Sequence, residues 1–162
     1  MKRILFAVVF PCIVSLCLGA GISVAGEKTK PPRFEDYPVR EKYDGKNAPP
    51  GLQSPEEREF RTMLREAAQN PPDFAGHFIV GAWGCGAGCV SSAIIDAKSG
   101  AVYMVPFTAS VTGDRPGEPI EYKADSSLFV VHGSRNEADE NGDFYYQWDG
   151  KTLKLIDSKV IK

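Results

Sequence analysis

The chain has 162 residues, with 19 Lys and Arg against 21 Asp and Glu and a formal net charge of −2. This length supports one domain with a single hydrophobic core. The slight acidic excess, together with the lack of a basic stripe carrying interleaved aromatic residues, argues against nucleic acid as a partner.

The first segment, residues 1–25, has the composition of a signal peptide. Lys2 and Arg3 precede the apolar run 4–18, and small residues occupy the positions that a signal peptidase reads before a cleavage point after Ala25. The run is shorter than the ~20 residues of a membrane span. We therefore expect cleavage, no stable membrane insertion, and a periplasmic or secreted protein. Loss of the two basic residues leaves a mature net charge of about −4.

Residues 26–53 are predicted to be a proline-rich, extended leader to the domain at 54–162. Prolines in this segment remove backbone donors and prevent helix formation. Phe34, Tyr37 and Tyr43 complicate this picture, because three aromatic side chains are unusual in a free linker. They favour a strap, part of which lies on the folded body.

One amphipathic helix is predicted over residues 55–69. Ser54 as N-cap, Pro55 in the first turn and Glu57 three residues after the cap form its start signal. Apolar side chains then repeat at the spacing of a single buried stripe. These side chains are Phe60, Met63, Leu64, Ala67 and Ala68. Asn70 and the two prolines after it end the helix, which we expect to lie on a sheet.

Short strands separated by turn residues follow Asp73 and predict an antiparallel meander, so the fold class is α+β and mostly β. The first strand, residues 78–83, has apolar side chains on both faces, which predicts a place inside the sheet and not at its edge. The later strands are predicted at residues 90–95, 101–107, 128–132, 144–148 and 153–156.

Two local features of these strands carry specific predictions. The loop 96–100 is expected to form a hairpin turn, with Gly100 at a position that needs positive φ. Along the strand at 144–148, alternation places Phe144, Tyr146 and Trp148 on one face, which is expected to be the core face.

Cys85 and Cys89 are the two cysteines that remain after the predicted cleavage. An extended chain would hold their Cα atoms ~13 Å apart, whereas a disulfide needs them within about 7 Å. Gly86 and Gly88 allow the chain to curl, and an oxidising compartment favours bridging. The sequence therefore predicts a small disulfide ring at a corner between two strands.

A thiol or metal site is the alternative interpretation of these cysteines. Redox enzymes more often place two residues between their cysteines at a helix N-terminus, whereas Cys85 and Cys89 have three between them in a strand setting. A copper or zinc site would need a further ligand, for which His77 is the candidate. The sequence contains no hydrolase elbow, zinc-protease helix or phosphate-binding glycine loop. It therefore favours a non-enzymatic protein without a cofactor.

Five motifs span most of the chain after residue 73. They are Phe74-Ala75-Gly76-His77, Trp83-Gly84-Cys85-Gly86 with Cys89, Ile94-Ile95-Asp96, Ser99-Gly100-Ala101-Val102-Tyr103 and Tyr145-Tyr146-Gln147-Trp148. This pattern resembles small exported proteins of Gram-negative bacteria that carry no assigned activity. The resemblance implies a shared fold and export, and it transfers no catalytic residue.

A fainter likeness is to periplasmic lysozyme inhibitors, some of which use a loop with serine, glycine and tyrosine to block the cleft of the enzyme. The corresponding residues here are Ser99, Gly100 and Tyr103, with the tyrosine three residues after the glycine instead of two. The likeness implies an inhibitor-like role for the hairpin at 96–103.

The hypothesis that combines these features is an exported, non-enzymatic binding module of the cell envelope. Its recognition surface would join the hairpin at 96–103 to the glycine corner at 84–89. The candidate contact residues are Trp83, Ser99, Gly100 and Tyr103. The expected partner is a protein of the envelope or the secreted enzyme of a competitor.

Overall fold

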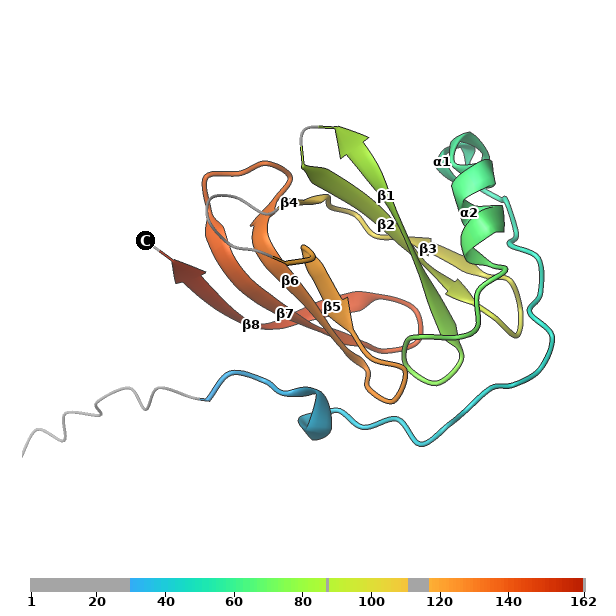
Figure 1. Ribbon diagram of the computed structural model, residues 1–162, viewed down its shortest axis with the longest axis horizontal. Helices are drawn as coiled ribbons and strands as arrows, with labels where there is room; N and C mark the ends of the chain where they lie inside the picture. The colour runs from blue at the N-terminus through green and yellow to red at the C-terminus, as the bar shows by residue number, and fades with distance from the viewer. Residues whose placement is uncertain (1–29, 87, 111–116, 162) are drawn as a thin grey trace, which may run out of the picture.

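The computed structural model describes residues 30–86, 88–110 and 117–161. Within these residues the chain forms an eight-stranded antiparallel sheet preceded by two short α-helices, so the fold is mostly β, as predicted (Figure 1). The helical elements are the 3-10 turn η1 (Phe34–Asp36), α1 (Pro55–Glu59) and α2 (Arg61–Ala67). The strands are β1 (Phe78–Gly86), β2 (Cys89–Asp96), β3 (Val102–Met104), β4 (Ala109–Ser110), β5 (Ile120–Tyr122), β6 (Leu128–Arg135), β7 (Asn141–Trp148) and β8 (Leu153–Ile161).

The strand order is β1-β2-β4-β6-β7-β8, with β3 paired to β2 and β5 paired to β6. On one side β2 therefore has two successive neighbours, β3 beside residues 93–95 and β4 beside residues 89–90. In the same way β6 pairs with β4 at one end and with β5 further along. Figure 1 shows the result, in which β1–β3 and β5–β8 form two halves joined through the short strand β4.

The main hydrophobic core is formed by side chains from both halves of the sheet. Phe74 and Phe129 are completely buried. The prediction for the aromatic strand is confirmed, because Phe144, Tyr146 and Trp148 in β7 are at most 5% exposed. Burying one large apolar side chain stabilises a fold by ~1.5–3 kcal/mol. This aromatic cluster therefore holds the two halves together.

Helix α2 packs on the face of β1 that lies opposite to the main core. Leu64 is completely buried there, together with Ile79 and Ile95 from β1 and β2. The helix lies close to the strand, since a Cβ atom added at Gly81 would be 2.8 Å from the Cβ of Ala67. The prediction of a helix lying on a sheet is confirmed.

The single predicted helix is interrupted at Phe60. The helix start is as predicted: Ser54 Oγ accepts a hydrogen bond from the Glu57 N–H at 3.1 Å, and the Glu57 carboxylate accepts one from the Ser54 N–H at 3.0 Å. Phe60 adopts φ −90° and ψ 18°, and its ring centroid lies 5.1 Å from that of Trp83. This ring contact accompanies the break. The predicted stripe is buried at its last three residues, but Met63 is 42% exposed, which corrects the prediction there.

Strand β1 is an edge strand, which corrects the prediction that it lies inside the sheet. It stands at the end of the strand order and pairs with β2. Both of its faces are nevertheless covered: Val80, 6% exposed, faces the main core, and Ile79, completely buried, faces the helix side. Because both faces are covered, β1 has the apolar sequence pattern that is typical of a central strand.

Residues 30–53 include a strap that lies on the folded body, as the aromatic residues in this segment predict. Backbone N–H groups of the strap donate to the body at four places: Val39 to Asp125, Tyr43 to Gly76, Ala48 to Ala97 and Gly51 to Gly100, at 2.7–3.1 Å. The Lys98 ammonium donates to the carboxylate of Glu41 and holds the pKa of that carboxyl below its ordinary value. The strap therefore packs on the domain that follows it.

The predicted signal peptide, residues 1–25, lies outside the described residues. Among the residues that the structure describes, no helix is long and apolar enough to cross a membrane. Export stays a prediction from the sequence.

Candidate functional site

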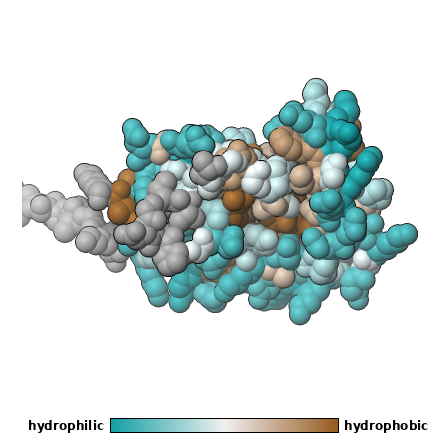
Figure 2. Space-filling model, turned by 45° about the horizontal axis from the view of Figure 1, so that its top comes forward, coloured by the Kyte–Doolittle hydropathy of each residue, from teal (hydrophilic) through white to brown (hydrophobic). Residues whose placement is uncertain are grey.

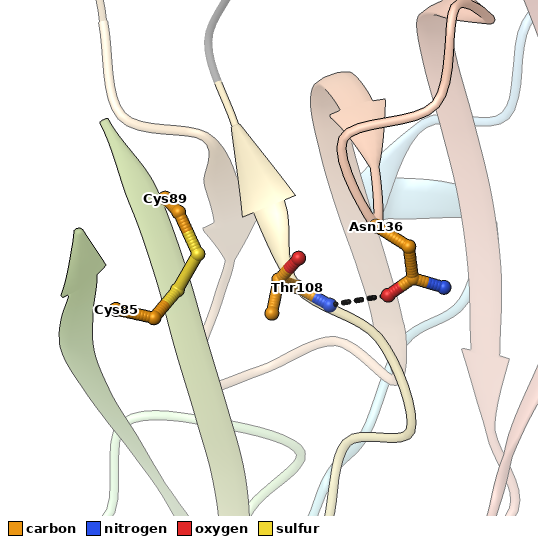
Figure 3. Close-up of a disulfide and its surroundings, with 4 residues drawn as sticks. All are labelled: Cys85, Cys89, Thr108 and Asn136. Atoms are coloured by element: carbon orange, nitrogen blue, oxygen red, sulfur yellow. Dashed lines mark hydrogen bonds between the residues drawn. A yellow bond between two sulfur atoms is a disulfide. The ribbon is translucent and has the colours of Figure 1, made fainter. Parts of the chain in front are cut away.

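Residues 84–86, 88 and 89 belong to the turn between β1 and β2, which we call the disulfide corner. Cys85 and Cys89 are bonded with their Cα atoms 5.1 Å apart, which confirms the predicted curl (Figure 3). Gly86 has φ 114° and Gly88 has φ 82°, in the region that favours glycine. The register shifts between Gly84 and Gly86, which leaves Cys85 as the extra residue of a bulge in β1.

The disulfide corner is exposed, although one of its cysteines is anchored. Cys89 is 6% exposed, whereas Cys85 and the corner glycines are exposed. A Cβ atom added at Gly84, Gly86 or Gly88 would meet no atom of the described residues within 4 Å. The corner therefore projects into open space from strands that are fixed in the sheet.

The segment beside the corner is held by a pair of hydrogen bonds. Cys89 pairs with Ser110 of β4. Just before β4, the Thr108 N–H donates to Asn136 Oδ1 at 3.0 Å, and the Asn136 N–H donates to the Thr108 carbonyl oxygen at 3.0 Å. In the view of Figure 3, Thr108 lies between the disulfide and Asn136, and a dashed line marks the bond from Thr108 to Asn136. These bonds connect the β6–β7 turn to the chain that flanks the corner, so the corner is presented from a fixed frame.

Trp83, a predicted contact residue, is part of the interface between helix and sheet. Its ring centroid lies 5.1 Å from that of Phe60, and its Nε1 atom is buried without a hydrogen-bond partner among the described residues. A buried donor without a partner costs ~1–3 kcal/mol. The indole is therefore held by packing and does not offer its polar edge to a ligand.

The predicted hairpin surface lies at the other end of β2. This strand runs from Cys89 to Asp96, so the disulfide corner and the turn after Asp96 are ~23 Å apart at about 3.3 Å per residue. The two turns therefore lie at opposite ends of the same strand, and a surface that includes both would have to extend along the whole of β2.

The strap covers much of that hairpin. Gly100 has φ 76°, as predicted, and is buried, and a Cβ atom there would lie 2.1 Å from a carbonyl oxygen of the strap. Ser99 is exposed, but its hydroxyl donates to the Asp96 carboxylate at 2.6 Å and closes the turn. Tyr103 packs on Trp148, with ring centroids 5.2 Å apart. These three predicted contact residues therefore have structural partners.

His77, the third ligand of the alternative metal site, is separated from the two cysteines. It precedes β1, and Cys85 lies near the far end of that strand. The His77 ring instead lies 3.0 Å from Glu41 and 3.7 Å from Asp96. Over residues 30–86, 88–110 and 117–161, no group of three or more His, Cys, Asp or Glu side chains is placed to hold a metal ion. The structure thus does not assemble Cys85, Cys89 and His77 into a ligand set.

A groove of about 540 Å³ runs beside the free edge of β1, and we call it the edge groove. Residues of α2, of the segment after it, of β1 and of β5 line it: Met63, Glu66, Ala67, Asn70, Asp73, Val80, Gly81, Ala82 and Tyr122. On the face of the molecule in Figure 2, hydrophobic side chains gather across the middle and hydrophilic side chains surround them. Sequence reasoning missed this groove, because it placed β1 inside the sheet.

Asp73 is the half-buried carboxyl group of the edge groove. Its Oδ1 accepts a hydrogen bond from the Val80 N–H at 2.9 Å, and its Oδ2 accepts one from the Tyr122 hydroxyl at 3.3 Å. Burial raises the pKa of Asp73. Burial, and then the neighbouring Asp73 charge, raise the pKa of Tyr122 to about 12. In the described part of the chain, neither Asp73 nor Glu66 forms an ion pair.

Comparisons of the chain with protein-family models, with curated proteins and with solved structures found no match. Its function is therefore inferred from geometry. The features that count are the exposed disulfide corner, the free edge of β1 that leads to it, and the acidic groove beside that edge.

Proposed function

We propose that the protein is an exported, non-enzymatic binding module of the cell envelope, which recognises a partner protein through the disulfide corner. The observation that carries this proposal is a covalently closed turn that projects into open space from a fixed sheet. The covalent closure limits the conformations of the turn before it binds, so less entropy is lost on association. The partner is a protein of the envelope or the secreted enzyme of a competitor.

The disulfide also supports the part of the proposal that concerns export to the cell envelope. Disulfides persist in oxidising compartments, and the first 25 residues have the pattern of a signal peptide. The hairpin at 96–103 is the rival recognition surface. It is the weaker one, because the strap lies against it and Tyr103 faces the core.

A capture experiment with two matched variants tests the proposal. Gly84→Arg adds bulk and charge at the corner, where a side chain meets no atom, and Ala101→Arg makes the same addition at an exposed position of the rival hairpin. Immobilised wild type and both variants are incubated with periplasmic extract, and the retained proteins are identified by mass spectrometry. We expect a protein that wild type and Ala101→Arg retain and that Gly84→Arg loses.

Circular dichroism and urea unfolding of the variants serve as the folding control. An unchanged set of retained proteins for Gly84→Arg, or a loss confined to Ala101→Arg, would overturn recognition by the corner. The double variant Cys85→Ser, Cys89→Ser is expected to retain the same protein more weakly, since it keeps the corner glycines but releases the covalent closure.

A further inference from the structure

We infer that the edge groove accepts an extended, lysine- or arginine-bearing segment of a partner protein, which adds to β1 as a further strand. This inference rests on the proposed function, because the free edge of β1 runs into the disulfide corner. It names the chemistry of the partner that the corner recognises.

The free edge of β1 offers backbone donors and acceptors for such a strand. The N–H of Val80 points away from β2, since it donates to Asp73 Oδ1 at 2.9 Å. Residues two apart in an antiparallel strand direct their backbone groups to the same side. The N–H and C=O groups of Ala82 and Gly84 therefore face the same edge. Edges with unpaired groups are the sites at which extended peptides add to sheets.

The space beside this edge fits a backbone and medium-sized side chains. Gly81, Ala82 and Gly84 present little side-chain bulk, and the groove volume is about 540 Å³. Met63, 42% exposed on the α2 wall, supplies an apolar contact. Five residues of an added strand would cover ~17 Å at about 3.4 Å per residue. That length extends from the groove to the disulfide corner.

The charges of the groove specify a cationic segment. Glu66 and Asp73 line it, and no Lys or Arg is among the described residues that line it. Asp73 accepts hydrogen bonds from two neutral donors, and in the described chain it has no cationic partner. A carboxylate withdrawn from water gains most from an incoming ammonium or guanidinium group. An acidic segment would be repelled by the same two carboxylates.

The opposite edge of the sheet is protected along its length, whereas on β1 the segment with Asp73 covers the edge from Phe78 to Val80 and leaves Ala82 and Gly84. In β8 the register shifts opposite Tyr145 and Tyr146, and Lys154 and Lys159 lie along the strand. Bulges and lysines are the devices that keep edge strands unpaired. From Phe78 to Gly84, in contrast, β1 keeps one continuous register and carries no lysine. Four apolar side chains of β8 are exposed, so β8 is the competing location in the experiment.

Peptide titration of the ¹⁵N-labelled purified protein, followed by NMR, tests the inference. The probe is a capped five-residue peptide of alternating valine and lysine. One control peptide has glutamate in place of lysine, and a second keeps lysine but is N-methylated at alternate amides, which removes the donors of an added strand. We expect saturable shifts of the Ala82 and Gly84 amide signals with the probe, and at least about tenfold weaker binding of both controls.

Two variants locate the charge effect. Glu66→Gln should weaken binding of the lysine peptide about two- to fivefold, in the range of a solvent-exposed ion pair. Asp157→Asn makes the same charge change on β8 and should alter binding less. Shifts confined to β8, equal binding of the glutamate or N-methylated peptide, or no saturable shift would each overturn the inference.

The two proposals fail separately. If Gly84→Arg loses its captured partner while the lysine peptide does not bind, recognition by the corner stands and strand addition is overturned. If the lysine peptide binds at Ala82 and Gly84 while Gly84→Arg captures the same proteins as wild type, strand addition to β1 stands and recognition by the corner is overturned.

Discussion

The contact between α2 and β1 makes a sharp prediction about Gly81. A Cβ atom at this position would lie 2.8 Å from the Cβ of Ala67, and its next nearest atom would be 3.7 Å away. Carbon atoms in ordinary contact are about 3.5–4.0 Å apart. Gly81→Ala must therefore displace α2 by roughly 1 Å, and α2 forms one wall of the edge groove.

The expected cost follows from overpacking. Gly81→Ala should lower the free energy of unfolding by about 1–3 kcal/mol. Strand propensity alone would predict the opposite sign, because alanine in place of a strand glycine stabilises by about 0.5–1 kcal/mol. Ala67→Gly removes the other methyl group of the pair and costs about 1 kcal/mol in a helix. In the double variant the clash is absent, so the two costs should be less than additive, with a coupling of about 1–3 kcal/mol.

Urea unfolding followed by tryptophan fluorescence measures this coupling. It is applied to wild type, the two single variants and the double variant, and the slope of the unfolding free energy against urea concentration must be the same in all four. Gly84→Ala is the matched control on the same strand, since its added methyl group meets no atom within 4 Å. We expect that control to be neutral or slightly stabilised. Additive single effects, or a Gly81→Ala protein as stable as Gly84→Ala, would refute the described packing of α2 on β1.

Three further predictions concern the corner, the strap and the groove. Replacing Cys85 and Cys89 by serine opens a ring of five residues, for which the chain-entropy relation gives a loss of about 2 kcal/mol in urea unfolding; an unchanged midpoint would contradict this. Gly100→Ala places a methyl group against a strap carbonyl oxygen at φ 76°, so limited proteolysis should cut the strap faster than in wild type, and equal rates would speak against it. Burial raises the pKa of Asp73 above its ordinary 3.8, so the folded chain keeps this proton to higher pH than the unfolded chain, and the stability it contributes falls as pH rises. The unfolding free energy of Asp73→Asn relative to wild type should therefore grow from about pH 3 to about pH 7, and a decline over that range would exclude the proposed burial.

The features that the sequence predicts correctly depend on neighbouring residues in the chain. The Ser54 cap, the positive φ of Gly100 and the curl between Cys85 and Cys89 are set by a few adjacent residues each. The burial of the aromatic face of β7 follows from strict alternation over a short strand. In these cases local backbone preference and tertiary packing favour the same structure, so the sequence pattern is sufficient to predict it.

The features that it misses depend on contacts between distant segments. Phe60 ends α1 where its ring meets Trp83, 23 residues further along the chain. The strap reaches Gly100 from about 50 residues away and covers a turn that composition alone presents as exposed. The ~23 Å between the two candidate turns follows from the length of β2, which the sequence prediction had placed correctly without drawing this consequence.

The edge position of β1 shows most clearly what an apolar pattern reports. Alternation records which faces of a strand are covered, and it carries no information about which edges are paired. Core side chains cover one face of β1 and α2 covers the other, so the strand has the composition of a central one. Its true position is visible in the backbone, where the N–H of Val80 is satisfied by the side chain of Asp73 and not by a neighbouring strand. The Val80 donor is satisfied by a side chain of the preceding segment, which marks where pairing on this side of β1 is replaced. The same alternation directs the backbone groups of Ala82 and Gly84 to the free edge of β1. The Asp73 carboxylate accepts the hydrogen bond that a neighbouring strand would otherwise accept from Val80. The same carboxylate would favour a cationic segment in the edge groove.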